Sequence, residues 1–137
     1  MIRKITIMDR RRTKNRIPTL KIAMITARKQ KVLKALDKAV SFYGYGLDSL
    51  FSNRTRKREY TDLRAIVWLI YQEHTQLSET QISSDFNWNR GTIFNAIRRA
   101  RELKEYNRNF SDMYDSIQGV FSNALANIDD EQSIMSN

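Results

Sequence analysis

The feature that most constrains the fold is a series of helical periodicities between residues 60 and 108. Apolar residues recur at the spacing of one buried helix face in residues 60–74, in a short segment that ends near Phe86, and again from Arg90 onward. Ser78 and Gln81 have the spacing of a capping box, which opens the second of these segments. The sequence therefore predicts a helix-turn-helix over residues 60–108.

Amphipathic periodicity also predicts helices on both sides of this region. One extends from Thr26 to Tyr43, where Gly44 follows, and a short one extends from Leu47 to Phe51. A last helix is predicted over residues 110–121, and its apolar stripe is expected to pack on the bundle, with a dimer seam as the alternative. The chain of 137 residues is thus expected to be a small all-α bundle of about five helices.

Charge divides the chain into three parts. Residues 1–25 are strongly basic and show no sustained period, which predicts an arm that is disordered when free and lies along phosphates when bound. The alternative for this arm is that residues 22–25 add a turn or a strand to the core. Residues 26–122 contain the predicted helices, and residues 123–137 are expected to form an acidic tail, loose from Asp129 onward.

The composition excludes several kinds of chemistry. No cysteine is present, so disulfides, thiolate zinc sites and cysteine nucleophiles are ruled out. The single histidine, His74, lies in a predicted helix, where a solvent-facing or partly packed ring is expected. No apolar run approaches the roughly 20 residues that span a bilayer, and no paired carboxylates or metal-ligand cluster stand out. We therefore expect a cytoplasmic, nucleoid-associated protein that is not an enzyme and uses no cofactor or metal.

The positive charge points to a polyanionic partner. The net charge is +9, which favours nucleic acid over an anionic membrane surface. Between two predicted helices, cations are concentrated at Arg54, Arg56, Lys57 and Arg58. Cations this close repel one another unless an anion is near, so DNA contact is favoured over a merely solvated loop. Arginines in such a loop can reach phosphates or enter a minor groove.

The third helix of the helix-turn-helix is expected to read base edges. Asn89 is predicted to cap this helix and to leave its first backbone N–H groups open to a phosphate. Side chains of its first turns meet bases in a recognition helix, and later ones meet phosphates. The predicted contacts are Asn89, Arg90, Gly91, Thr92, Asn95, Arg98 and Arg99.

Two further expectations concern the same region. Arg101 is also placed for phosphates, and one of the arginines of this helix has Glu102 or Glu105 as an alternative partner. Trp88 is expected to plug the turn against the core, with stacking on a base or sugar as the alternative.

Several segments between Ala39 and Ala100 occur in the order and spacing of a known DNA-binding domain. They are Phe42-Tyr43-Gly44, Asp48-Ser49-Leu50-Phe51, Thr55-Arg56-Lys57-Arg58-Glu59, Arg64-Ala65-Ile66-Val67, Leu77-Ser78-Glu79-Thr80-Gln81-Ile82, Phe86, Thr92-Ile93-Phe94-Asn95-Ala96 and Arg98-Arg99. The chain here resembles domain IV, the C-terminal DNA-binding domain of the bacterial chromosomal replication initiator DnaA, a Trp-repressor-like helix-turn-helix. The resemblance implies that Thr92 and its neighbours enter a major groove, and that Arg56 or Arg58 reads the adjacent minor groove.

The turn before the third helix departs from that family's pattern. The family usually has two glycines and then Arg-Asp-His-Thr-Thr, whereas this chain has Asn87-Trp88-Asn89-Arg90-Gly91-Thr92, one residue shorter. We therefore expect a different target site, or weaker specificity with more phosphate-driven affinity. The chain also contains no phosphate-binding loop, so the initiator's ATPase is not within it.

Together these features predict a sequence-preferring binder of double-stranded DNA from a bacterium, a phage or a mobile element. Its expected role is transcription regulation or control of replication initiation. The alternative is a protein-interaction module that docks through the helix over residues 110–121, with a basic face that is incidental or meets RNA. The sequence leaves the oligomeric state open: nothing in it requires a dimer, and a monomer is favoured over one.

Overall fold

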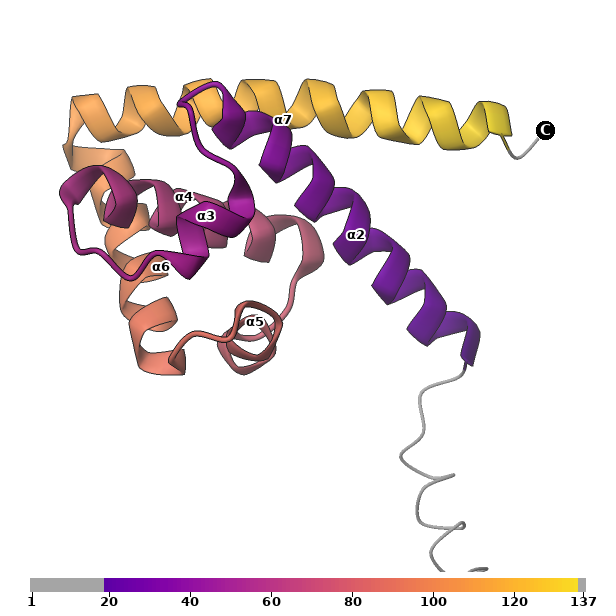
Figure 1. The fold of residues 1–137 in the computed structure, drawn as a ribbon, viewed down its shortest axis with the longest axis horizontal. Helices are drawn as coiled ribbons and strands as arrows, with labels where there is room; N and C mark the ends of the chain where they lie inside the picture. The colour runs from indigo at the N-terminus through magenta and orange to yellow at the C-terminus, as the bar shows by residue number, and fades with distance from the viewer. Residues whose placement is uncertain (1–18, 136–137) are drawn as a thin grey trace, which may run out of the picture.

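The computed structural model describes the backbone of residues 19–135 and the side chains of residues 25–130. This part of the chain contains six helices and no strand, which confirms the prediction of a small all-α bundle (Figure 1). The helices are α2 (Thr19–Ser41), α3 (Leu47–Ser52), α4 (Arg58–Thr75), α5 (Glu79–Phe86), α6 (Arg90–Tyr106) and α7 (Arg108–Met135). None of the helices in the described part is long and apolar enough to cross a membrane.

Helix α4 is the centre of the bundle. Every residue from Leu63 to Tyr71 is buried, so α4 is enclosed all round over these turns instead of burying one apolar face. Helices α2, α6 and α7 contact it, and Trp68 places its indole in the centre of an aromatic cluster with Phe51 and Phe86. This central helix is the support against which the loop before it and α6 are both positioned.

Helix α2 begins at Thr19, which corrects the predicted start at Thr26. The backbone of residues 19–25 is helical, so this segment is neither part of a separate arm nor a strand. The physical reason is local, because no glycine or proline follows Pro18 until Gly44 and nothing in the sequence stops the helix. The predicted arm over residues 1–18 lies outside the described residues.

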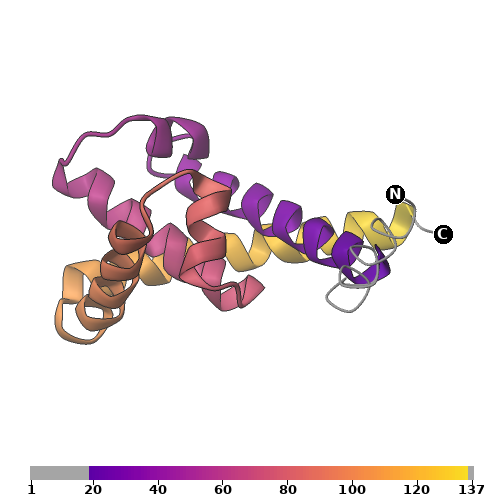
Figure 2. The ribbon, with the colours of Figure 1, turned by 90° about the horizontal axis from the view of Figure 1, so that it is seen from below.

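Helix α7 continues to Met135, which corrects the prediction of an acidic tail after residue 122. Its apolar period continues through Ala124, Leu125 and Ile128, whose side chains are buried. An ion pair of 3.3 Å between Lys31 Nζ and Asp129 Oδ1 also joins it to α2. Helices α2 and α7 contact each other and extend beyond the other helices on the same side (Figures 1 and 2). The acidic composition therefore did not indicate the end of the helix, because the buried apolar stripe continues beneath the charged face.

The turns agree with the predicted caps. Gly44 has a φ of 87°, a left-handed conformation that glycine adopts without strain at the end of α2. Asp37 Oδ1 accepts a hydrogen bond of 2.8 Å from the Leu47 backbone N–H and so holds the start of α3 against α2. Ser78 Oγ accepts from the Gln81 N–H at 3.3 Å and Gln81 Oε1 accepts from the Ser78 N–H at 3.0 Å, which confirms the capping box of α5.

Candidate nucleic-acid interface

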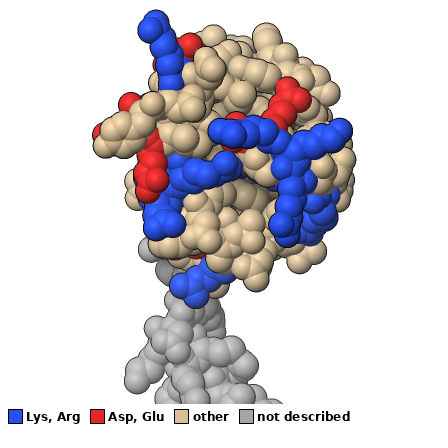
Figure 3. Space-filling model, turned by 90° about the vertical axis from the view of Figure 1, so that its left-hand side faces the viewer, with Lys and Arg blue, Asp and Glu red and all other residues tan. Residues whose placement is uncertain are grey.

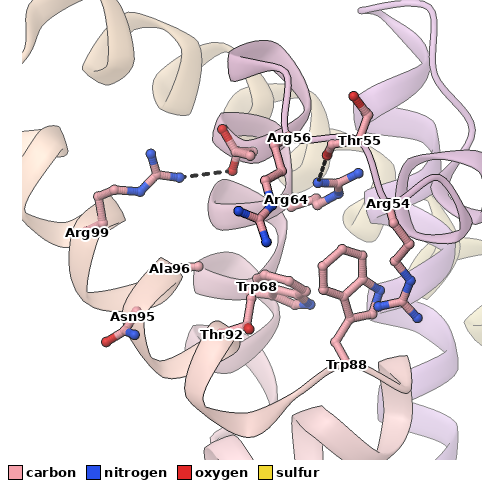
Figure 4. Close-up of a pocket in the computed structure, with 11 residues that line it drawn as sticks. Arg54, Thr55, Arg56, Arg64, Trp68, Trp88, Thr92, Asn95, Ala96 and Arg99 are labelled. Atoms are coloured by element: carbon pink, nitrogen blue, oxygen red, sulfur yellow. Dashed lines mark hydrogen bonds between the residues drawn. The ribbon is translucent and has the colours of Figure 1, made fainter.

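A cleft with a volume of ≈ 540 Å³ lies between the α3–α4 loop (residues 53–57) and α6 (Figure 4). The loop lines one side and α6 lines the other, with Trp68 and Trp88 between them. Predicted contact residues that line it are Arg54, Arg56, Thr92, Asn95 and Arg99. The other predicted residues, Lys57, Arg58, Asn89, Arg90, Gly91 and Arg98, are exposed but do not line it. Figure 3 shows Lys and Arg side chains gathered on this side of the molecule.

Arg64 is the residue that shapes the loop, although sequence reasoning assigned it no separate role. Its guanidinium is buried and donates hydrogen bonds to three backbone carbonyls, those of Leu50 at 2.9 Å, Thr55 at 2.8 Å and Asn53. Burial, and then the nearby charge of Arg54, lower the pKa of Arg64, which stays protonated because its ordinary pKa is so high. A buried charge in an otherwise apolar stretch of α4 was the available signal.

Arg54 connects the loop to the helix-turn-helix turn. Its guanidinium stacks on Trp88 at 4.0 Å from the ring centroid and donates to the Asn87 carbonyl at 3.1 Å. Trp88 Nε1 donates to the Phe51 carbonyl at 3.0 Å, and the ring packs on Trp68, which confirms that Trp88 plugs the turn. Arg54 therefore lies at the cleft with its guanidinium already in contact with Asn87 and Trp88 of the turn.

Asn89 caps α6 as predicted, with a consequence that was not expected. Its Oδ1 accepts from the backbone N–H groups of Gly91 at 2.8 Å and Thr92 at 3.3 Å. These two N–H groups are therefore not open to a phosphate, and the prediction of an open helix end is wrong for them. The cap instead fixes the direction in which α6 leaves the turn.

Helix α6 presents a clear division between its faces. Ile93 and Ile97 are buried against the core, whereas Thr92 and Asn95 are exposed and line the cleft. Phe94 is 50 % exposed on the outer side, an aromatic residue that sequence reasoning did not single out. The exposure of Phe94 could have been predicted from the sequence, because residue 94 is out of phase with the buried stripe of α6.

The arginines in the second half of α6 contact α4 instead of the glutamates on their own helix. Arg99 lies 3.4 Å from Asp62 Oδ1 and donates to the Thr61 carbonyl at 3.2 Å. Arg101 donates to Gln72 Oε1 at 2.8 Å. Neither Glu102 nor Glu105 pairs with them, which corrects that alternative. Asp62 lies 37 positions from Arg99 and Gln72 lies 29 positions from Arg101, so these contacts appear only in the fold.

Several of the predicted cations have an exposed charged end with one ion pair or none among the described residues. Arg58 is 75 % exposed and lies 3.6 Å from Asp62 Oδ2, so it shares that carboxylate with Arg99. Among the described residues, no side-chain hydrogen bond or ion pair is formed by Arg56, Lys57, Arg90 and Arg98. They stand on the loop and on α6, the two segments that border the cleft.

The apolar stripe of α7 has a different use. Phe110, Ile117 and Phe121 are buried in the core, which confirms packing on the bundle over a dimer seam. No group of acidic residues and histidine within the described residues could hold a metal ion.

A function for this chain has to be inferred from the geometry of the cleft. No family model, no curated protein and no solved structure matches the chain.

Proposed function

We propose that the chain binds double-stranded DNA with a preference for sequence, through α6 and the α3–α4 loop. The observation that carries this proposal is the position of the unpaired cations, which stand on the loop and on α6, the two segments that border one cleft, with Arg56 lining the cleft itself. Like charges gathered in this way raise the energy of the free protein and are offset by a polyanion. A helix-turn-helix whose last helix, α6, exposes Thr92 and Asn95 on its first turns is suited to a major groove.

The proposed geometry places two segments in two adjacent grooves. Helix α6 enters the major groove with Thr92 and Asn95, whose hydroxyl, methyl and amide groups can contact base edges. Arg56 reaches from the loop toward the adjacent minor groove, where the narrow walls strengthen its attraction to the DNA. The sugar-phosphate strand between the two grooves then passes along the cleft, with the aromatic floor beneath it.

This proposal agrees with the resemblance to domain IV of the replication initiator and departs from it at the turn. The role proposed is transcription regulation or replication control in a bacterium or a phage, without an ATPase on this chain. Asn89 caps α6 in a turn that lacks the family's Asp-His pair, so the preferred site is proposed to be this chain's own. Arg64, which is buried beneath the loop, acts by holding Arg56 in place.

Selection of bound sequences from a randomised duplex pool tests the proposal. We expect an enriched motif and an affinity that falls steeply with salt, in proportion to the phosphates neutralised. Arg56→Ala is expected to weaken binding to the selected site about 10-fold or more. Lys34→Ala is the matched control, because it removes one exposed lysine from α2 that lines no part of the cleft. A DNA affinity that changes neither with salt concentration nor in Arg56→Ala would overturn the proposal.

Changes within α6 separate reading of bases from attraction to phosphates. Thr92→Ala and Asn95→Ala are expected to change the enriched motif, whereas Arg98→Ala is expected to weaken binding to all sequences alike. If single-stranded RNA were bound in preference to duplex DNA, or if binding required a protein partner, the alternative functions would replace the proposal.

A further inference from the structure

Asp62 places a negative charge between two of the arginines that face the proposed DNA. Its Oδ2 lies 3.6 Å from Arg58 Nε, and its Oδ1 lies 3.4 Å from Arg99 Nη1. The Asp62 side chain is 13 % exposed, so it is held in place by its surroundings, whereas both arginines keep contact with solvent. Arg99 lines the cleft, and Arg58 stands where the loop enters α4.

Both ion pairs are of a kind that another anion can replace. One carboxylate serves two guanidinium groups at distances longer than the best charge-assisted hydrogen bonds. Arg58 precedes Asp62 by four residues on α4, and this order of a basic and then an acidic residue is the less favourable one for a helix. A DNA phosphate offers the same charge on two unesterified oxygen atoms that can accept a bidentate pair, so it can take either arginine from Asp62.

We propose that Asp62 competes with DNA phosphates for Arg58 and Arg99 and thereby limits the affinity of the protein for DNA of any sequence. The inference rests on the proposed DNA binding. Binding then requires these two arginines to leave one carboxylate, and the carboxylate itself remains beside the DNA backbone, where it repels phosphates. Both effects reduce the part of the affinity that carries no sequence information.

The residues proposed to read bases are separate from this competition. Thr92 and Asn95 lie on the first turns of α6 and have no hydrogen bond to Asp62 or to its two arginines. A weaker phosphate contribution makes a larger share of the binding energy depend on the bases. Asp62 is therefore proposed to favour sequence preference over indiscriminate binding, without touching a base.

Asp62→Asn tests this directly, because the amide keeps the shape of the side chain and removes its charge. The measurement is fluorescence anisotropy with a random-sequence duplex over a range of salt concentrations. We expect the variant to bind about 3- to 10-fold more tightly near 0.1 M salt, with a salt dependence steeper by about one phosphate. The matched control is Asp115→Asn, which removes an equal charge from the exposed face of α7 and is expected to leave the affinity unchanged.

A second variant identifies the arginine involved. In Asp62→Asn combined with Arg99→Ala, the gain over Arg99→Ala alone is expected to be smaller than the gain in the wild-type background. Circular dichroism melting of each variant establishes that the proteins compared are folded.

The outcomes distinguish the inference from the function on which it rests. If the wild-type protein binds the duplex and Asp62→Asn binds it equally or more weakly, Asp62 merely positions Arg99 and the inference is wrong. A gain that persists in full without Arg99 and also without Arg58 contradicts it as well. If neither the wild-type protein nor the variant binds DNA, the proposed function fails, and the inference fails with it.

Discussion

Helices α6 and α7 follow each other directly and bury similar apolar stripes, yet their solvent faces carry opposite charge. Ile93 and Ile97 of α6 and Phe121 of α7 are buried in one core. The exposed side of α6 includes Arg90 and Arg98, whereas α7 has no Lys or Arg after its first residue. Because burial makes the same demand on both helices, it does not explain this difference. We attribute the cations of α6 to the proposed binding of DNA, whereas the buried stripe of α7 supports the fold.

The largest expected effect is on the supporting side. Phe121→Ala removes a fully buried ring that also meets the His74 ring edge to face, with ring centroids 4.6 Å apart. We expect the free energy of unfolding to fall by about 3–5 kcal/mol, because the cavity cannot close completely. Urea denaturation gives this value. Below the melting transition, DNA affinity is expected to stay unchanged, and a folded variant that loses affinity would show that α7 does more than support.

Arg64→Ala is expected to affect both sides of the comparison. It leaves loop carbonyls that accept from the buried guanidinium without a donor, which costs about 1–3 kcal/mol of stability. It also releases the loop that carries Arg56, so DNA affinity is expected to fall even at temperatures where the variant is folded. Arg64→Lys should recover only part of either loss, since an ammonium cannot reproduce the planar fork. Full recovery by lysine would contradict the role given to the three carbonyls.

Moving one positive charge from α6 to α7 distinguishes the position of the charge from the net charge of the chain. Arg98→Ala is expected to change stability by less than about 0.5 kcal/mol, and to reduce the salt dependence of DNA binding by about one phosphate. Adding Ser116→Arg on the exposed face of α7 restores the net charge of the chain. Affinity is expected to remain reduced in this double variant. A full recovery would mean that net charge alone, and not its position on α6, governs binding.

The smallest expected effect is a pH dependence at the junction of α2, α4 and α7. Burial, and then the charge of Arg28, lower the pKa of His74 below its ordinary value of 6.5. The folded protein therefore binds a proton less readily than the unfolded chain, and stability is expected to fall as the pH drops below about 6.5. Melting temperatures at two pH values on either side of 6.5 measure this, with His74→Gln as the control that should lose the histidine contribution.

The helix boundaries in the middle of the fold were predictable because local capping residues determine them. Ser78 and Asn89 begin α5 and α6 through caps that need only neighbouring residues. The outer ends of α2 and α7 were not predictable in the same way, since charge suggested an arm and a tail. No stop signal separates these segments from the helices, and α7 continues through Ile128 on a buried stripe.

The candidate site was predictable in its location and not in its connections. The cations of the loop and α6 stood out in the sequence, and the structure brings Arg56, Thr92 and Asn95 to one cleft. The sequence did not reveal that Trp88 binds Arg54 or that Asp62 binds Arg99. Such pairs depend on how helices that are distant in the sequence cross in the fold, and residue spacing does not determine these crossings.

Chemical-shift mapping with an enriched duplex tests the central claim most directly. A titration followed by amide resonances of the isotope-labelled protein reports which surface meets the DNA. We expect the largest changes on residues 53–57 and on the first turns of α6, and none on the exposed face of α7. Changes centred on α7, or none at a DNA concentration that saturates binding, would contradict it.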